Sequence, residues 1–152
     1  NLGERIFEEK LTNPSECALA VTAEGEYFIS IRHESPQRKR ALAVSADGIS
    51  NWRDFRFAEN LSDPVCMGSM THRDGVIYHS NCDSQEGRVN LTVKISEDCF
   101  ATHRSIFVSK EAGYSDIALL DNSLCILYEK TIPKEPRGAM PFVLYFETID
   151  LL

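Results

Sequence analysis

The sequence has no long apolar run and no excess of positive charge, and each absence excludes a class of protein. A transmembrane helix needs about 18 or more consecutive apolar residues, whereas the apolar runs in these 152 residues are only a few residues long. Acidic residues outnumber basic ones by 23 to 16, which gives a net charge of −7. A nucleic-acid partner would require a basic face. We therefore expect neither a membrane span nor a nucleic-acid ligand.

Paired metal-ligand motifs are also lacking. The five cysteines form no Cys-x-x-Cys pair and show no spacing with histidine suited to zinc, so we expect no metal site. All except Cys82 lie in or beside an apolar run, which favours buried free thiols over a disulfide framework. The sequence begins at Asn1 with no initiator Met. The true N-terminus is therefore not visible and the compartment cannot be read from it, although a secreted or periplasmic protein is slightly favoured.

Short runs rich in Val, Ile, Leu, Tyr and Phe recur between turn residues, and helical periodicity is almost absent. This pattern is typical of an all-β protein. The loops between the runs carry Asn-Pro, Asp-Gly and Asp-Asn pairs, which favour tight turns. We predict strands at residues 17–22, 27–31, 41–45, 65–70, 76–80, 90–96, 117–120, 124–128 and 142–147.

An internal repeat divides the chain into three similar units. The hairpin glycines Gly25 and Gly75 are 75 − 25 = 50 positions apart, and the serines of two Ser-x-Asp motifs, Ser45 and Ser96, are 96 − 45 = 51 apart. A third copy places its turn at residues 121–123. Units of about 50 residues with three or four strands are typical of propeller blades. We predict blades at residues 13–60, 61–110 and 111–152, within one domain.

Three blades are too few for a closed ring. A propeller needs roughly four to eight, because only closure removes the open edges of its sheets. The third unit also ends after its third strand, at Leu152. We therefore expect the chain to be the C-terminal half of a larger propeller, completed by an upstream half or by a second copy.

Two turn segments carry a resemblance to a known family. They read Ser45-Ala-Asp47-Gly-Ile-Ser-Asn-Trp52 and Ser96-Glu-Asp98-Cys-Phe-Ala-Thr-His103. Both resemble the Asp-box, Ser-x-Asp-x-Gly-x-Thr-Trp, of sialidase-type propellers, although an apolar residue replaces the glycine in each. In that family the aspartate closes its own turn through backbone N–H groups, so the motif indicates fold rather than catalysis. The resemblance implies a six-bladed sialidase-type β-propeller.

The strand ends extend this resemblance to a possible active site. The likeness runs from about residue 13 to residue 152 and includes the string Ala-Gly-Tyr-Ser-Asp, which is the most specific match. It implies an exo-α-sialidase-like glycoside hydrolase that removes terminal sialic acid from a sialoglycan with retention, without a metal or organic cofactor. The residues that match the family's glutamate, two arginines, tyrosine and final glutamate, in that order, are Glu16, Arg32, Arg88, Tyr114 and Glu129.

The carboxylate of the substrate explains these residue types. Guanidinium groups bind a carboxylate through two parallel hydrogen bonds, and the resemblance assigns Arg32 and Arg88 to that task. A carboxylate nucleophile would be repelled by the substrate, so sialidases attack with a neutral tyrosine, here Tyr114. A phenol has a pKa near 10, and the resemblance gives Glu16 the role of accepting its proton. It gives Glu129 the role of orienting an arginine.

Other functions stay open from the sequence alone. The family's remaining arginine and its catalytic aspartate would lie upstream of Asn1. If they differ there, the protein could be a hydrolase of the same fold acting on another glycoside. If the acid is missing, a non-catalytic carbohydrate-binding propeller is the better interpretation. The charged cluster at residues 37–40 is expected to be a solvated loop rather than an anion site.

Overall fold

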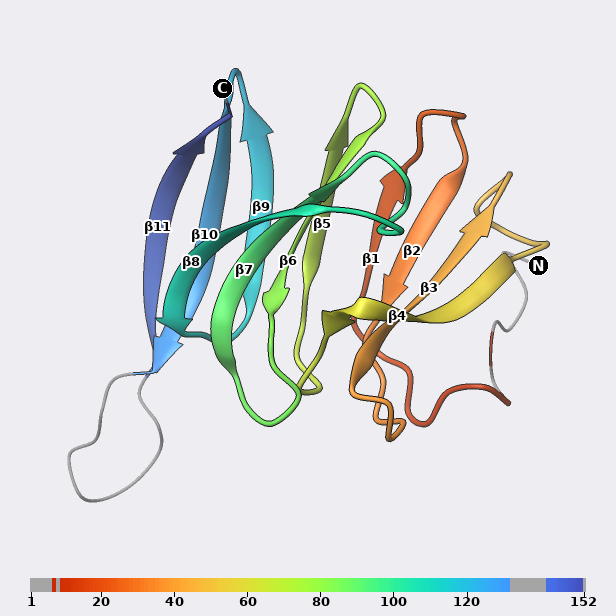
Figure 1. The fold of residues 1–152 in the computed structure, drawn as a ribbon, viewed down its shortest axis with the longest axis horizontal. Helices are drawn as coiled ribbons and strands as arrows, with labels where there is room; N and C mark the ends of the chain where they lie inside the picture. Colours follow the sequence, from red (N-terminus) through yellow and green to blue (C-terminus); the bar gives the residue numbers. More distant parts are fainter. Residues whose placement is uncertain (1–6, 8, 132–141, 152) are drawn as a thin grey trace.

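The computed structural model describes residues 7, 9–131 and 142–151, and these residues form strands and turns without any helix. Nothing in this described part could therefore cross a membrane as a helix. The strands form three antiparallel sheets, in each of which the strands follow their order in the sequence (Figure 1). The all-β fold predicted from the repeat is confirmed.

Two of the sheets have four strands and the third has three. The first sheet contains β1 (Cys17–Val21), β2 (Tyr27–Ile31), β3 (Lys39–Ser45) and β4 (Arg53–Ser62). The second contains β5 (Ser69–Arg73), β6 (Val76–Cys82), β7 (Val89–Ser96) and β8 (Arg104–Glu111). The third contains β9 (Ser115–Leu120), β10 (Ser123–Thr131) and β11 (Phe142–Asp150).

The outermost strands β4 and β8 lie outside the strands predicted from the sequence. Both carry several charged residues, and β8 is mostly exposed while most of β4 is at least half-buried, so their apolar alternation is weak. Register shifts also interrupt the pairing of β4 with β3. The predicted strand at 65–70 is displaced, because Asp63 Oδ1 accepts the Cys66 N–H at 2.8 Å and Val65 has a φ of 68°. These two features make a turn, and β5 begins only at Ser69.

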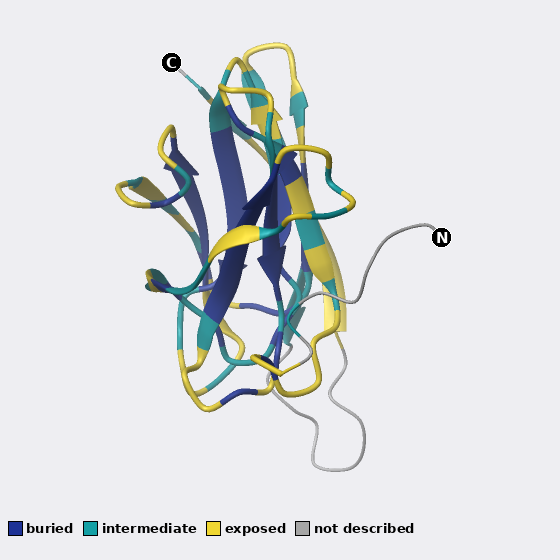
Figure 2. Ribbon diagram, turned by 90° about the vertical axis from the view of Figure 1, so that its right-hand side faces the viewer, coloured by how far each residue is buried: buried dark blue, intermediate teal, exposed yellow. Residues whose placement is uncertain are grey.

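The first strand of each sheet lies toward the others: β1 contacts β5, and β5 contacts β9 (Figure 1). Apolar side chains fill the two spaces between the sheets, and the middle strands are accordingly the buried ones (Figure 2). Phe28, Leu42 and Ile77 belong to the cluster between the first and second sheets. Leu91, Val93, Ile117, Leu124 and Ile126 belong to the cluster between the second and third sheets.

The two end sheets differ in how their far faces are covered. Phe7 and Leu11 pack over the far face of the first sheet, against residues of β2 and β3. The far face of the third sheet instead exposes large apolar side chains, with Leu144 66% and Phe146 65% accessible. We call this surface the outer face of the third sheet; its large apolar members are Leu120, Leu127, Phe142, Leu144 and Phe146.

Candidate active site

Four of the five residues that the sequence singled out lie next to the ends of strands. Glu16 directly precedes β1 and Arg32 directly follows β2, and because these strands pair antiparallel the two residues share one end of the first sheet. The Arg32 N–H donates to the Glu16 carbonyl at 3.2 Å. Tyr114 directly precedes β9, whose partner β10 carries Glu129, and the Glu129 N–H donates to the Tyr114 carbonyl at 2.9 Å.

The side chains of Glu16, Arg32 and Arg88 meet around the phenol of Tyr114. Its hydroxyl donates to Glu16 Oε1 at 2.6 Å. Arg32 forms an ion pair with the other oxygen, Glu16 Oε2, and its Nη1 lies 3.5 Å from the Tyr114 hydroxyl. The guanidinium of Arg88, which lies just before β7, sits over the Tyr114 ring at 5.0 Å from the centroid. The three sheets thus contribute to one cluster of a phenol, a carboxylate and two guanidinium groups.

The charges and hydrogen bonds in this cluster determine which of Tyr114 and Glu16 is protonated at neutral pH. Burial acts to raise the pKa of the Glu16 carboxyl, but hydrogen bonds from Tyr114 and Arg32 outweigh it and leave that pKa below its usual value. The hydrogen bond to Glu16, together with burial, raises the pKa of the Tyr114 phenol. At neutral pH the pair is therefore a protonated phenol beside an ionised carboxylate, which is the state a nucleophile and its base need before reaction.

Glu129 contacts the backbone of the tyrosine. Its Oε2 accepts the Tyr114 N–H at 2.9 Å. A Cβ atom on Gly113 would lie 2.5 Å from the same oxygen, which is too close for two non-bonded atoms. The Glu129 carboxylate therefore fits at this place only because residue 113 is a glycine. Within the described ranges no arginine pairs with Glu129. Its role in orienting an arginine stays a prediction.

Two buried thiols lie beneath the tyrosine. Cys66 and Cys82 both donate to the Gly113 carbonyl, at 3.4 and 3.5 Å. Both are free and buried, as expected for cysteines that behave as small apolar residues. The expectation was wrong for Cys17, which is exposed because it begins β1 at the rim of the first sheet.

Arg40 is the residue near the site that sequence reasoning misjudged. The cluster at 37–40 was expected to be solvated, yet Arg40 is fully buried and forms an ion pair with Asp63 at 2.8 Å. Strand β3 begins one residue earlier, at Lys39, so Arg40 shares a face with the buried Leu42. That alternation was the available signal, and the sequence offered no indication of which carboxylate would pair with the arginine.

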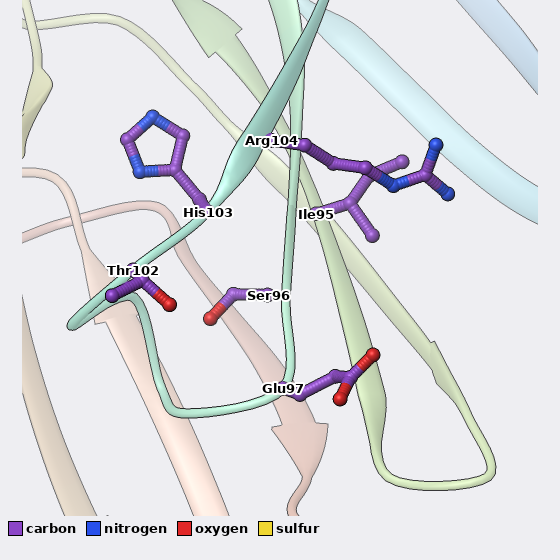
Figure 3. Close-up of a pocket in the computed structure, with 6 residues that line it drawn as sticks. All are labelled: Ile95, Ser96, Glu97, Thr102, His103 and Arg104. Carbon is purple, nitrogen blue, oxygen red and sulfur yellow. The ribbon is translucent and has the colours of Figure 1, made fainter.

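Two of the hollows on the described surface differ in chemistry. A cavity of about 150 Å³ borders the site, with Tyr114, Met67 and Leu144 in its lining. A larger one of about 350 Å³ lies at the turn between β7 and β8. There His103 and Arg104 point in different directions (Figure 3), and Ser96 is engaged with Asp98 of its own turn. We therefore assign the candidate site to the Tyr114 cluster.

The described part of the chain offers no group of three or more His, Cys, Asp or Glu side chains that could hold a metal ion. The two aspartate turns have a structural role instead. Asp47 Oδ1 accepts the N–H groups of Ile49 and Ser50 at 2.9 and 2.8 Å. Asp98 Oδ1 likewise accepts the Thr102 N–H at 2.9 Å. Each carboxylate closes its own turn, as the sequence pattern predicts.

Comparison with known proteins relates the chain to sialidases. No family model matches it. It is 28% identical over 136 residues to a sialidase of Bacteroides fragilis (strain YCH46), a match that covers 80% of this chain and 25% of the relative. The chain thus spans about a quarter of the length of the curated relative that it matches.

Solved structures show the same likeness. A Hadza microbial sialidase superposes with a TM-score of 0.68 at 26% identity, covering 78% of this chain and 25% of the other. The intramolecular trans-sialidase from Ruminococcus gnavus superposes with a TM-score of 0.71 at 18% identity, covering 92% and 33%. The resemblance to the sialidase superfamily is confirmed, and the three sheets match blades of a sialidase-type β-propeller.

Proposed function

We propose that the protein containing this chain is an exo-α-sialidase that removes terminal sialic acid with retention, using Tyr114 as nucleophile and Glu16 as its base. The observation that supports this most directly is the 2.6 Å hydrogen bond from the Tyr114 hydroxyl to Glu16 Oε1, between residues 98 positions apart. Such a contact matches the separation required for direct proton transfer. The sialidase likeness of the whole chain adds the substrate class.

Substrate binding would rest on the two arginines. Arg88 sits over the tyrosine ring, and Arg32 has a buried Nε atom without a hydrogen-bond partner in the structure. A sialic acid carboxylate beside the phenol could accept hydrogen bonds from both guanidinium groups. That contact would hold the anomeric carbon, which bears the carboxylate, against the Tyr114 oxygen.

The first chemical step forms the bond between the tyrosine oxygen and the anomeric carbon and breaks the bond to the leaving group. The phenol proton passes to Glu16 Oε1, and a general acid must protonate the leaving oxygen. We assign that acid to residues upstream of Asn1, along with a third arginine that Glu129 would orient. In the second step water attacks the same carbon and gives a proton to the conjugate base of that acid, the bond to the tyrosine oxygen breaks, and Glu16 returns the first proton to the phenolate.

The outer face of the third sheet fits the same proposal. Its apolar side chains and the edge of β11, which pairs with no further strand of the described residues, would be covered by the upstream half of the propeller, with a second copy as the alternative. With the upstream half in place, the active site would combine Tyr114 and Glu16 of this chain with the upstream acid.

A second candidate function is a hydrolase of the same fold that acts on a different glycoside, since folds host many chemistries. A non-catalytic carbohydrate-binding propeller is the third. The Tyr114–Glu16 contact favours an enzyme, because binding alone needs no phenol paired with a carboxylate.

The test is Tyr114→Phe in the full-length protein, assayed with an aryl sialoside. Loss of the nucleophile should lower kcat on the order of a thousandfold or more. KM should change little, because the arginines remain. Arg88→Lys is the matched comparison and should mainly raise KM, since the guanidinium fork is lost. A Tyr114→Phe variant with near-normal turnover would rule out the mechanism, and an inactive wild-type protein that still binds the sugar would support the binding propeller.

A further inference from the structure

We infer that Arg40 is a positioning residue for the Tyr114–Glu16 pair. Its buried guanidinium, neutralised by Asp63, ties together the backbone segments that carry the two reacting groups. Arg40 touches neither the phenol nor the carboxylate of that pair. The inference concerns the geometry of the pair and rests on the proposed function only for its catalytic consequence.

The donors of the guanidinium reach into several segments. Nε donates to Ser30 Oγ at 2.9 Å, and Nη2 donates to the Ser30 carbonyl at 3.2 Å. Nη1 donates to Asp63 Oδ2 at 2.8 Å and to the Cys66 carbonyl at 2.9 Å. Nη2 also lies 3.5 Å from the Glu16 carbonyl. A planar, rigid donor set of this kind fixes the relative positions of its acceptors, which a flexible ammonium group would not.

One branch of this network leads to the base. The Glu16 carbonyl accepts from the Arg32 N–H at 3.2 Å as well as from Arg40. Ser30, which is bound by the same guanidinium, lies two residues before Arg32 on β2. Arg40 therefore contacts the backbone of both paired segments, at the Glu16 carbonyl just before β1 and at the Ser30 carbonyl on β2.

The other branch leads to the nucleophile. The Cys66 carbonyl accepts from Arg40, the Cys66 N–H donates to Asp63 Oδ1 at 2.8 Å, and the Cys66 thiol donates to the Gly113 carbonyl at 3.4 Å. Gly113 directly precedes Tyr114. The ion pair thus fixes Cys66 on two sides, and Cys66 supports the residue from which the tyrosine projects.

Stability alone is a weak explanation for this arginine. Removing two charges from water costs several kcal/mol per ion, and replacement of a buried pair by apolar residues is often neutral or stabilising. Arg40 and Asp63 are nevertheless 0% and 3% accessible. A positioning role explains this burial better than a gain in stability does. Arg40 must be buried to reach the carbonyl groups on both branches of the network.

The experiment follows Tyr114 directly, without substrate. The full-length protein is labelled with ¹³Cζ-tyrosine, the Tyr114 signal is assigned by its loss in Tyr114→Phe, and its pH titration is recorded by NMR. In the wild type, the hydrogen bond to Glu16 raises the pKa of this phenol. In Arg40→Lys the pair should separate, and the titration midpoint should fall by about half a pH unit or more. Arg38→Lys, an exposed arginine two residues away, is the matched control and should leave the midpoint unchanged.

A second variant avoids an unpaired buried charge. Arg40→Met/Asp63→Leu removes both ions and keeps the volume apolar, so it should fold even where a single change does not. It should show the same fall in the Tyr114 midpoint. Folded variants of both kinds whose Tyr114 signal titrates as in the wild type would overturn the inference.

Kinetics then separate positioning from the proposed function. Misplacement of a reacting group by about 1 Å can lower kcat by about a hundredfold. We expect a loss of that order in Arg40→Lys with KM nearly unchanged, and no loss in Arg38→Lys. A shifted titration in a protein whose wild type has no sialidase activity would support Arg40 as a positioning residue and refute the proposed function. Full kcat in Arg40→Lys would refute the positioning role.

Discussion

The space between the first and second sheets contains buried polar side chains beside its apolar cluster, whereas the outer face of the third sheet exposes apolar side chains. In the first, the fully buried Arg40 and His79 are held by Ser30, whose hydroxyl contacts Arg40 Nε at 2.9 Å and His79 Nε2 at 3.0 Å. On the second, Leu144 and Phe146 are about two-thirds exposed. For these residues the usual arrangement of polar groups outside and apolar groups inside is reversed.

The reversal has a different meaning at each place. Buried polar groups are tolerated where they find hydrogen-bond partners, and the Arg40 guanidinium meets this condition because each of its three nitrogens donates to an oxygen. An exposed apolar patch is instead the mark of a surface that another polypeptide covers. The first region therefore bears on the candidate active site, and the second bears on which polypeptide covers the outer face.

The largest effect should come from breaking the buried pair. Asp63→Ala leaves the charge of Arg40 without its partner, and we expect a loss of about 3–5 kcal/mol in the free energy of unfolding. Glu59→Ala breaks the exposed ion pair with Lys39 and should cost at most about 1 kcal/mol. Urea unfolding of both variants measures the difference. Equal losses would mean that burial of the charge does not govern the energetics of this region.

A smaller effect should follow from making the outer face polar. We expect the isolated 152-residue chain to associate through this surface. Burial of one large apolar side chain contributes about 1.5–3 kcal/mol, so Leu144→Lys should weaken association by about tenfold to a hundredfold. Sedimentation velocity over a concentration series measures this. Phe107→Lys, which changes an exposed residue of β8, is the control and should have little effect. A wild-type chain that stays monomeric at high concentration would contradict the prediction.

The smallest effect concerns pH. Burial, together with the charges of Arg40 and Lys94, holds the pKa of the His79 imidazole well below its usual value. The unfolded chain therefore binds one more proton than the folded chain once the pH falls below about 6.5. The part of the free energy of unfolding that depends on His79 is fully present above that pH. Below it, the free energy of unfolding should fall by about 1.4 kcal/mol per pH unit.

His79→Gln should remove this part of the pH dependence, as measured by urea unfolding at pH 7, 6 and 5. His72→Gln changes an exposed ring and should retain the wild-type slope. The same slope in His79→Gln as in the wild type would show that another group titrates in this range.

Local sequence patterns predicted the inner strands because their apolar residues are nearly continuous. They missed β4 and β8, whose charged residues face solvent at the outer edge. They also misplaced Arg40, because a strand pattern identifies residues that share a face without identifying what packs against that face. The five candidate site residues came from a family resemblance. The contact between Glu16 and Tyr114 depends on how the first and third sheets pack, which no short-range pattern encodes; their catalytic roles stay predictions.

The sequential order of strands within each sheet also determines the order in which contacts can form while the chain is being synthesised. Each sheet pairs only neighbouring strands, so it can form soon after its last strand is made, whereas Glu16 must wait for a partner 98 residues later. At common translation rates of about 5–20 residues per second, that wait is about 5–20 s. Once β4 has been made and the first sheet has formed, Glu16 is fixed beside Arg32 with no phenol to bind until Tyr114 is synthesised. The contact between Glu16 and Tyr114 is therefore among the last in the chain to form, although Glu16 is among the first residues made.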